Sequence, residues 1–201
     1  MNINASDRTL GLLNIWQVVR KLDWEVELMK SIPGTILLGA APENAMQFKD
    51  AQLYAAINAA STSVALVDWL YHLAQENSDV NSRVLHKLKL EEISTIKSFR
   101  RMLREKHEPL NICHQICNSN KHLHLSDYDS GLKILIGDII FERPDGTEEL
   151  SVIAQVLWSN GTSYPSGSVF NLLDNLRHWW KSLITEINAP EREIFYPDFA
   201  P

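Results

Sequence analysis

Residues 113–124 gather the side chains of this chain that are best suited to chemistry. Their sequence is CHQICNSNKHLH, which holds both cysteines of the protein and three of its seven histidines. Imidazoles and thiols bind metals and move protons. The segment follows residues 83–107, which carry eight lysines and arginines against three glutamates in a chain whose net charge is −6. We therefore expect a site for a metal, a proton transfer or a phosphate in this region.

A metal site is one interpretation of this cluster. Cys113, Cys117, His122 and His124 offer the four nitrogen and sulfur ligands that structural zinc takes. The spacing Cys-x3-Cys places both thiols on one face of a helix, whereas zinc knuckles use Cys-x2-Cys in a turn. Cysteines at apolar positions of an amphipathic helix commonly pack in a core. We therefore expect core packing and no cofactor, and keep the metal site as an alternative.

A basic stripe precedes the cluster. Lys97, Arg100, Arg101 and Arg104 fall at i, i+3, i+4 and i+7 of an expected helix, so they share one face, and Lys121 adds a cation further on. The stripe either binds phosphates of RNA or a nucleotide, or is a solvated face paired with acidic neighbours. Because the whole chain is acidic, any polyanion is expected at this one place.

Residues 116–122 also resemble the motif of HEPN domains. That superfamily is built on an antiparallel helical bundle. Its nuclease members carry an arginine, often followed by a polar residue such as asparagine, and then a histidine a few positions on. Here Asn118 matches the polar position and His122 the histidine, whereas Cys117 stands where the arginine belongs. The resemblance covers about residues 42–124 and rests on this short motif.

The resemblance implies a metal-independent RNA-cleaving site in which two protomers bring their motifs together. His122 would act as general base or acid, Asn118 would orient the substrate, and Arg100 or Arg104 would stabilise charge on phosphorus. Because cysteine cannot supply the arginine's cation, we expect a degenerate relative that binds RNA or a nucleotide. A homodimer, a prokaryotic toxin–antitoxin or phage-defence setting and an antitoxin-type protein partner are also implied.

Two other interpretations stay open. Asn118, Lys121 and His122 are residue types that a helix C-terminus favours without any ligand. The chain could also be a non-catalytic interaction module whose hairpin and last helix dock a partner. The sequence contains no phosphate-binding glycine loop of the Walker or dinucleotide type and no nucleophile elbow.

Hydrophobic spacing predicts the elements that position these residues. Helices are expected over residues 14–31, 42–76 and 90–106, with a fourth that starts near Pro109. Two strands over residues 132–141 and 150–158 flank a turn at residues 143–146, with a bulge at Gly137 in the first strand. A loop over residues 159–168 leads to a last helix over residues 169–187. Small residues in the second helix allow a close approach of another helix.

The expected fold class is therefore mainly α: an antiparallel helical bundle with an appended β-hairpin and C-terminal helix (α+β). We expect residues 1–128 to form the bundle, and residues 129–201 to form the hairpin, last helix and tail packed on it. The first residues lack the basic-then-apolar order of a secretory signal, and polar residues interrupt the apolar residues 51–74. A cytoplasmic location without a membrane span is the expectation.

Overall fold

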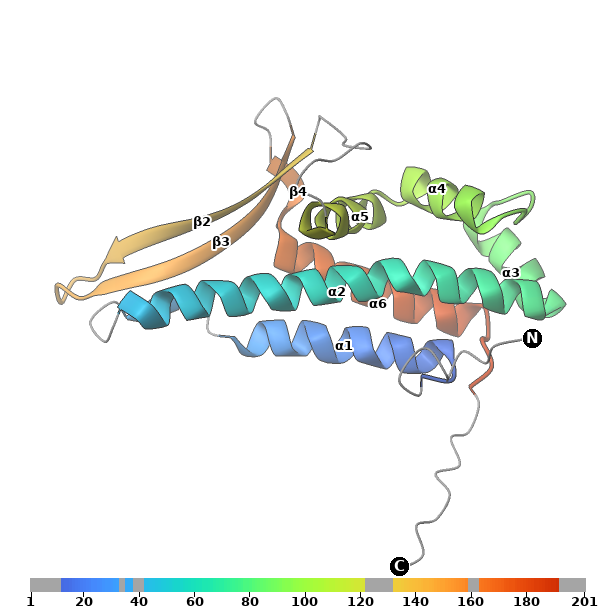
Figure 1. Cartoon of the computed structure of the whole chain (residues 1–201), viewed down its shortest axis with the longest axis horizontal. Coiled ribbons are helices and arrows are strands. Elements are labelled where there is room, and N and C mark those ends of the chain that lie inside the picture. The colour runs from blue at the N-terminus through green and yellow to red at the C-terminus, as the bar shows by residue number, and fades with distance from the viewer. Residues whose placement is uncertain (1–11, 33–34, 38–41, 122–131, 159–162, 192–201) are drawn as a thin grey trace, which may run out of the picture.

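The computed structural model describes residues 12–32, 35–37, 42–121, 132–158 and 163–191. Six helices and four strands lie in these ranges, and Figure 1 shows their arrangement. The fold is mainly helical with an appended hairpin, as the sequence predicts. The helices are α1 (Ile15–Ser31), α2 (Pro42–Glu76), α3 (Ser78–Leu88), α4 (Ile96–Lys106), α5 (Glu108–Lys121) and α6 (Val169–Glu186). The strands are β1 (Thr35–Leu37), β2 (Leu132–Glu142), β3 (Glu148–Trp158) and β4 (Ser163–Ser168).

The first helix begins where its capping residues place it. The Asn14 side chain accepts a hydrogen bond from the Gln17 amide at 3.0 Å, and the Gln17 side chain accepts one from the Asn14 amide at 3.3 Å. This reciprocal capping box satisfies amides that have no partner within the helix. The apolar side chains that follow on one face are buried. They are Ile15, Val18, Val19, Leu22, Val26 and Met29.

The second helix is the axis of the bundle. It has 35 residues, which at 1.5 Å per residue makes it about 50 Å long. Small side chains let other helices approach it closely, and five of them are buried: Ala55, Ala56, Ala59, Ala60 and Ser63. The segment Asp50–Glu76 is also long and apolar enough to cross a membrane, and half of its apolar window is buried in the protein. A core helix meets the same criterion.

The last helix belongs to the core of the bundle. It lies antiparallel to α1, because Lys181 pairs with Asp23 at 2.8 Å and Asp174 pairs with Lys30 at 2.9 Å. Its predicted inward side chains are all buried, and Trp180 is fully inaccessible. One hydrophobic cluster includes residues of α1, α2, α5 and α6. The helices before residue 128 and α6 therefore share one core.

The hairpin forms at the predicted turn. The Gly146 amide donates to the Arg143 carbonyl at 2.9 Å, and Gly146 adopts a φ of 81°, which glycine tolerates without steric cost. The Asp145 carboxylate accepts from the Thr147 amide at 3.0 Å. The predicted bulge at Gly137 is wrong, because Gly137 pairs in register with Ile153.

Three local elements differ from the sequence-based expectation. Strand β4 lies in the predicted loop over residues 159–168, and β1 lies between the first two helices; both pair with β3. Segments as short as these give little strand signal of their own, so their pairing with β3 decides their conformation. Helix α3 was missed, because Asn77 was interpreted as the stop of α2. Its side chain accepts hydrogen bonds from the amides of Asp79 and Val80 and thus starts α3.

Candidate functional site

The two cysteines pack in the core between α5 and α2. Cys113 is fully buried and Cys117 is 5% exposed. The Cys117 Sγ lies 3.4 Å from the Ser61 Oγ. Burial, with a smaller contribution from neighbouring Cys117, raises the pKa of the Cys113 thiol far above its ordinary range. A thiol of this kind stays protonated, whereas zinc binds the thiolate.

The other two proposed zinc ligands, His122 and His124, lie outside the described residues. Within the described ranges, no group of three or more histidine, cysteine or acidic side chains is placed to hold a metal. The described part of the cluster is therefore a packing element.

Asn118 and His114 form a polar pair one helical turn apart on α5. The Asn118 Nδ2 lies 3.0 Å from the His114 Nε2, and both side chains are partly buried. The amide donates to this ring nitrogen when that nitrogen carries no proton. Helix α5 ends at Lys121, so His122 follows directly on the described helix. His114, Asn118 and His122 recur every four residues in the sequence, and the first two are the part of this series that the structure describes.

The basic stripe on α4 divides into paired and unpaired cations. Arg100 donates to both carboxylate oxygens of Asp68 on α2, at 2.6 and 2.5 Å, and the hydrogen bond to Asp68 raises the pKa of Arg100. Arg101 lies 3.8 Å from Glu105 in an exposed pair. Among the described residues, Lys97 and Arg104 have no ion-pair partner. Lys97, Arg101 and Arg104 therefore still form a cationic face on α4, although Asp68 engages Arg100.

Within the described residues, Arg100 of the stripe and the motif residues Cys117 and Asn118 lie at different places along α2. Arg100 contacts Asp68, whereas Cys117, next to Asn118, contacts Ser61. Asp68 and Ser61 are seven residues apart on α2, which is about 10 Å along its axis. Figure 1 shows α5 and α4 one after the other along the same side of α2. Arg100 therefore does not take the place of the missing arginine beside Asn118 in the same chain.

Two other cations of the basic segment donate hydrogen bonds to carbonyls at the C-terminal ends of helices, a role that the sequence did not predict. The Arg83 guanidinium donates to the Ile187 carbonyl at 2.8 Å, at the C-terminal end of α6. The Lys106 ammonium donates to the Lys89 carbonyl at 2.7 Å, at the end of α3. Carbonyls at a helix C-terminus lack partners within the helix and attract cations. Much of the local positive charge is therefore structural.

No family model matches this sequence, and no curated protein or solved structure is significantly similar to it.

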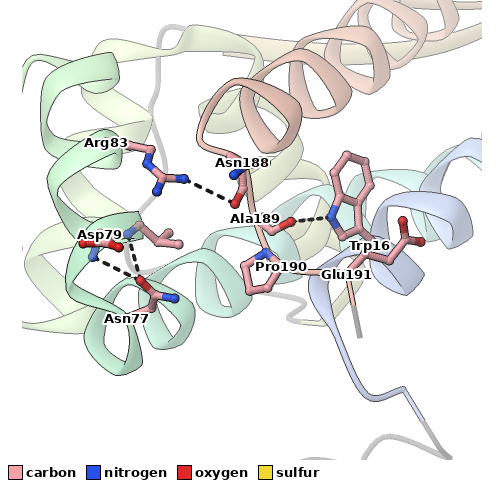
Figure 2. Close-up of a pocket in the computed structure, with 9 residues that line it drawn as sticks. Trp16, Asn77, Asp79, Arg83, Asn188, Ala189, Pro190 and Glu191 are labelled. Carbon is pink, nitrogen blue, oxygen red and sulfur yellow. Dashed lines mark hydrogen bonds between the residues drawn. The ribbon is translucent and has the colours of Figure 1, made fainter. Parts of the chain in front are cut away.

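A cleft of about 470 Å³ lies at the end of the bundle where α1, α3 and the end of α6 meet (Figure 2). Its polar groups bind one another. The Trp16 indole donates to the Ala189 carbonyl at 2.9 Å, and Arg20 on α1 pairs with Glu191 at 2.6 Å. On the opposite wall of the cleft, Arg83 donates to the Ile187 carbonyl at the end of α6. These contacts hold the segment after α6 against α1 and α3, so the cleft is part of the bundle's end closure.

Proposed function

We propose that this protein is a HEPN-like RNA-binding protein that binds its ligand through the solvent face of α4 and does not cleave it. The observation that carries this proposal is the set of cations left on that face. Lys97, Arg101 and Arg104 lie at i, i+4 and i+7, so they span about 10 Å along the helix. A cationic face on an acidic protein binds a polyanion locally.

The pairing of these cations supports the proposal. Lys97 is exposed, and neither it nor Arg104 has an ion-pair partner among the described residues. The side chains of Arg101 and Glu105 are 69% and 67% exposed. Exposed pairs of this kind contribute little and are screened by salt. A phosphate can therefore compete with Glu105 for Arg101, whereas the two hydrogen bonds to Asp68 engage Arg100.

Binding without cleavage follows from the residue beside Asn118. An RNA-cleaving site of the HEPN kind uses an arginine to stabilise charge on phosphorus, and the buried Cys117 thiol cannot do so. Among the described residues, Asn118 pairs with His114 and with no arginine. The motif then serves as a polar helix end, and the toxin–antitoxin or phage-defence setting rests on the resemblance alone.

The test is the salt dependence of RNA binding. Fluorescein-labelled single-stranded RNA is titrated by anisotropy at 50 and 200 mM salt with the wild type and with the Lys97→Ala, Arg101→Ala, Arg104→Ala triple variant. Each phosphate contact contributes about 0.7 to the slope of log affinity against log salt on single strands. The triple variant should bind at least tenfold more weakly, with a slope shallower by about two.

A matched control removes three cations elsewhere. The Arg20→Ala, Lys87→Ala, Arg143→Ala variant has the same net charge, and each of its cations forms an ion pair in the wild type. Equal losses in both triple variants, or no binding by the wild type at 50 mM salt, would contradict the proposal. RNA cleavage by the wild type that His122→Ala abolishes would instead establish a nuclease.

A further inference from the structure

Strand β2 lies at one edge of the sheet that the described residues form. It pairs with β3 over eleven residues, from Leu132 opposite Trp158 to Glu142 opposite Glu148. Strands β1 and β4 both pair with β3 as well, so they occupy its other side. Within the described residues, the outer side of β2 pairs with no strand. An edge strand of this kind offers its outward amides and carbonyls to another chain.

The distal part of this edge exposes large apolar side chains. Ile139, Ile140 and Phe141 are 40%, 58% and 50% exposed. Successive residues of a strand point to opposite faces, so the exposure is a property of the edge and not of one face. Leu150, opposite Ile140 on the central strand, is only 7% exposed. These three side chains of the edge strand are therefore uncovered, whereas the central strand is covered at Leu150.

The edge lacks three of the features that normally prevent pairing between chains, although it carries Lys133, Asp138 and Glu142. Proteins protect edge strands by keeping them short, by bulges, and by proline or several charges. The eleven residues of β2 contain no proline, and their pairing with β3 runs through Gly137 without a bulge. Figure 1 shows the turn end of the hairpin beyond the start of α2.

We propose that two copies of this chain dimerise through antiparallel pairing of their β2 edges, centred on Gly137. Two identical strands paired in this way are related by a two-fold axis, which is the commonest symmetry of homodimers. Centring on Gly137 uses all eleven residues and places Ile140 opposite residue 134, also an isoleucine. The two four-stranded sheets then form one continuous sheet.

Charge disfavours some of the alternative registers, and shorter pairing disfavours the others. Centring the pair on Asp138 places the two copies of that aspartate opposite each other. Centring it on Ile140 places Asp138 opposite Glu142. Like charges directly opposite each other in a sheet are destabilising. The register centred on Gly137 opposes no like charges and is the longest of those that the two-fold axis allows.

The first experiment measures mass against concentration. Sedimentation equilibrium of the full chain should give a dimer, and Ile140→Lys should raise its dissociation constant at least tenfold. Leu37→Lys is the matched control, because Leu37 is 53% exposed on β1, at the other edge of the sheet, and should leave the constant unchanged. A monomeric wild type, or equal weakening by both substitutions, overturns the proposal.

A second variant tests the register independently of affinity. Residues that face each other in an antiparallel pair have Cα atoms about 4.5 to 5.5 Å apart, a distance that a disulfide spans. Gly137→Cys should therefore form a covalent dimer on air oxidation, seen by non-reducing electrophoresis. Thr147→Cys, in the exposed turn of the same hairpin, should stay monomeric under the same conditions. No crosslink at position 137, or equal crosslinking at both positions, overturns the register.

Discussion

Arg100 of α4 donates two hydrogen bonds to Asp68 of α2, at 2.6 and 2.5 Å. The two side chains are 48% and 34% exposed, so the pair lies at the rim of the bundle and not in its core. The planar guanidinium matches the carboxylate with two parallel bonds, a geometry that lysine cannot reproduce. This contact holds α4 on α2 and removes Arg100 from the cations available to a ligand.

Arg100→Ala should therefore affect stability more than RNA binding. We expect the free energy of unfolding to fall by about 1 kcal/mol, the upper range for exposed pairs. RNA affinity should change less than in Arg104→Ala, since Arg104 has no described ion-pair partner. Urea denaturation and RNA anisotropy measure the two quantities. A larger loss of RNA affinity in Arg100→Ala than in Arg104→Ala would show that Arg100 leaves Asp68 to bind phosphate.

Arg177 is the centre of a charge network between α1 and α6. Its side chain is only 9% exposed and pairs with Asp23, Glu27 and Asp174. Arg177→Ala should lower the free energy of unfolding by about 2 kcal/mol, because it leaves three neighbouring carboxylates without their shared cation. Lys181→Ala is the control: Lys181 is 46% exposed and its loss should cost less than about 1 kcal/mol. Equal effects in urea denaturation would contradict a central role for Arg177.

The same network makes stability depend on acid pH. The hydrogen bond from Arg177 lowers the pKa of Glu27. Burial raises the pKa of Asp174, but Lys30 and Arg177 outweigh it and the net pKa lies below the ordinary value of 3.8. Carboxylates with a depressed pKa in the folded state stabilise it at higher pH and lose that contribution as they become protonated. Wild-type stability should therefore fall below about pH 4.5, and Arg177→Ala should show a shallower fall.

His107, at the junction of α4 and α5, should control stability at a milder pH. Its ring lies 4.0 Å from the ring of Trp179 on α6, and burial lowers its pKa from 6.5. The unfolded chain therefore binds a proton more readily than the folded chain, so stability is lost as pH falls below about 6.5. Between pH 7.5 and 5.5, His107→Phe should lose less free energy of unfolding than the wild type. Parallel pH profiles from urea denaturation would contradict this assignment.

Most of the helical fold was predictable from sequence, because its signals are local. The apolar spacing of α1, Pro109 in the first turn of α5 and the inward face of α6 all recur in the structure. The Asp145–Gly146 turn was equally predictable, since few residue types accept the positive φ that it needs at Gly146. Helix α3 was missed because Asn77 marks a helix start as well as a stop.

The role of residues 113–124 could not be predicted from sequence in the same way. Sequence by itself determined that Cys113 and Cys117 share an apolar helix face and that cations line α4. Only the tertiary structure decided that Asp68 engages Arg100 and that α4 and α5 contact α2 about 10 Å apart. Spacing along a helix sets which residues share a face. The partner that each side chain meets depends on how separate helices pack, and this rests on contacts between residues far apart in the chain.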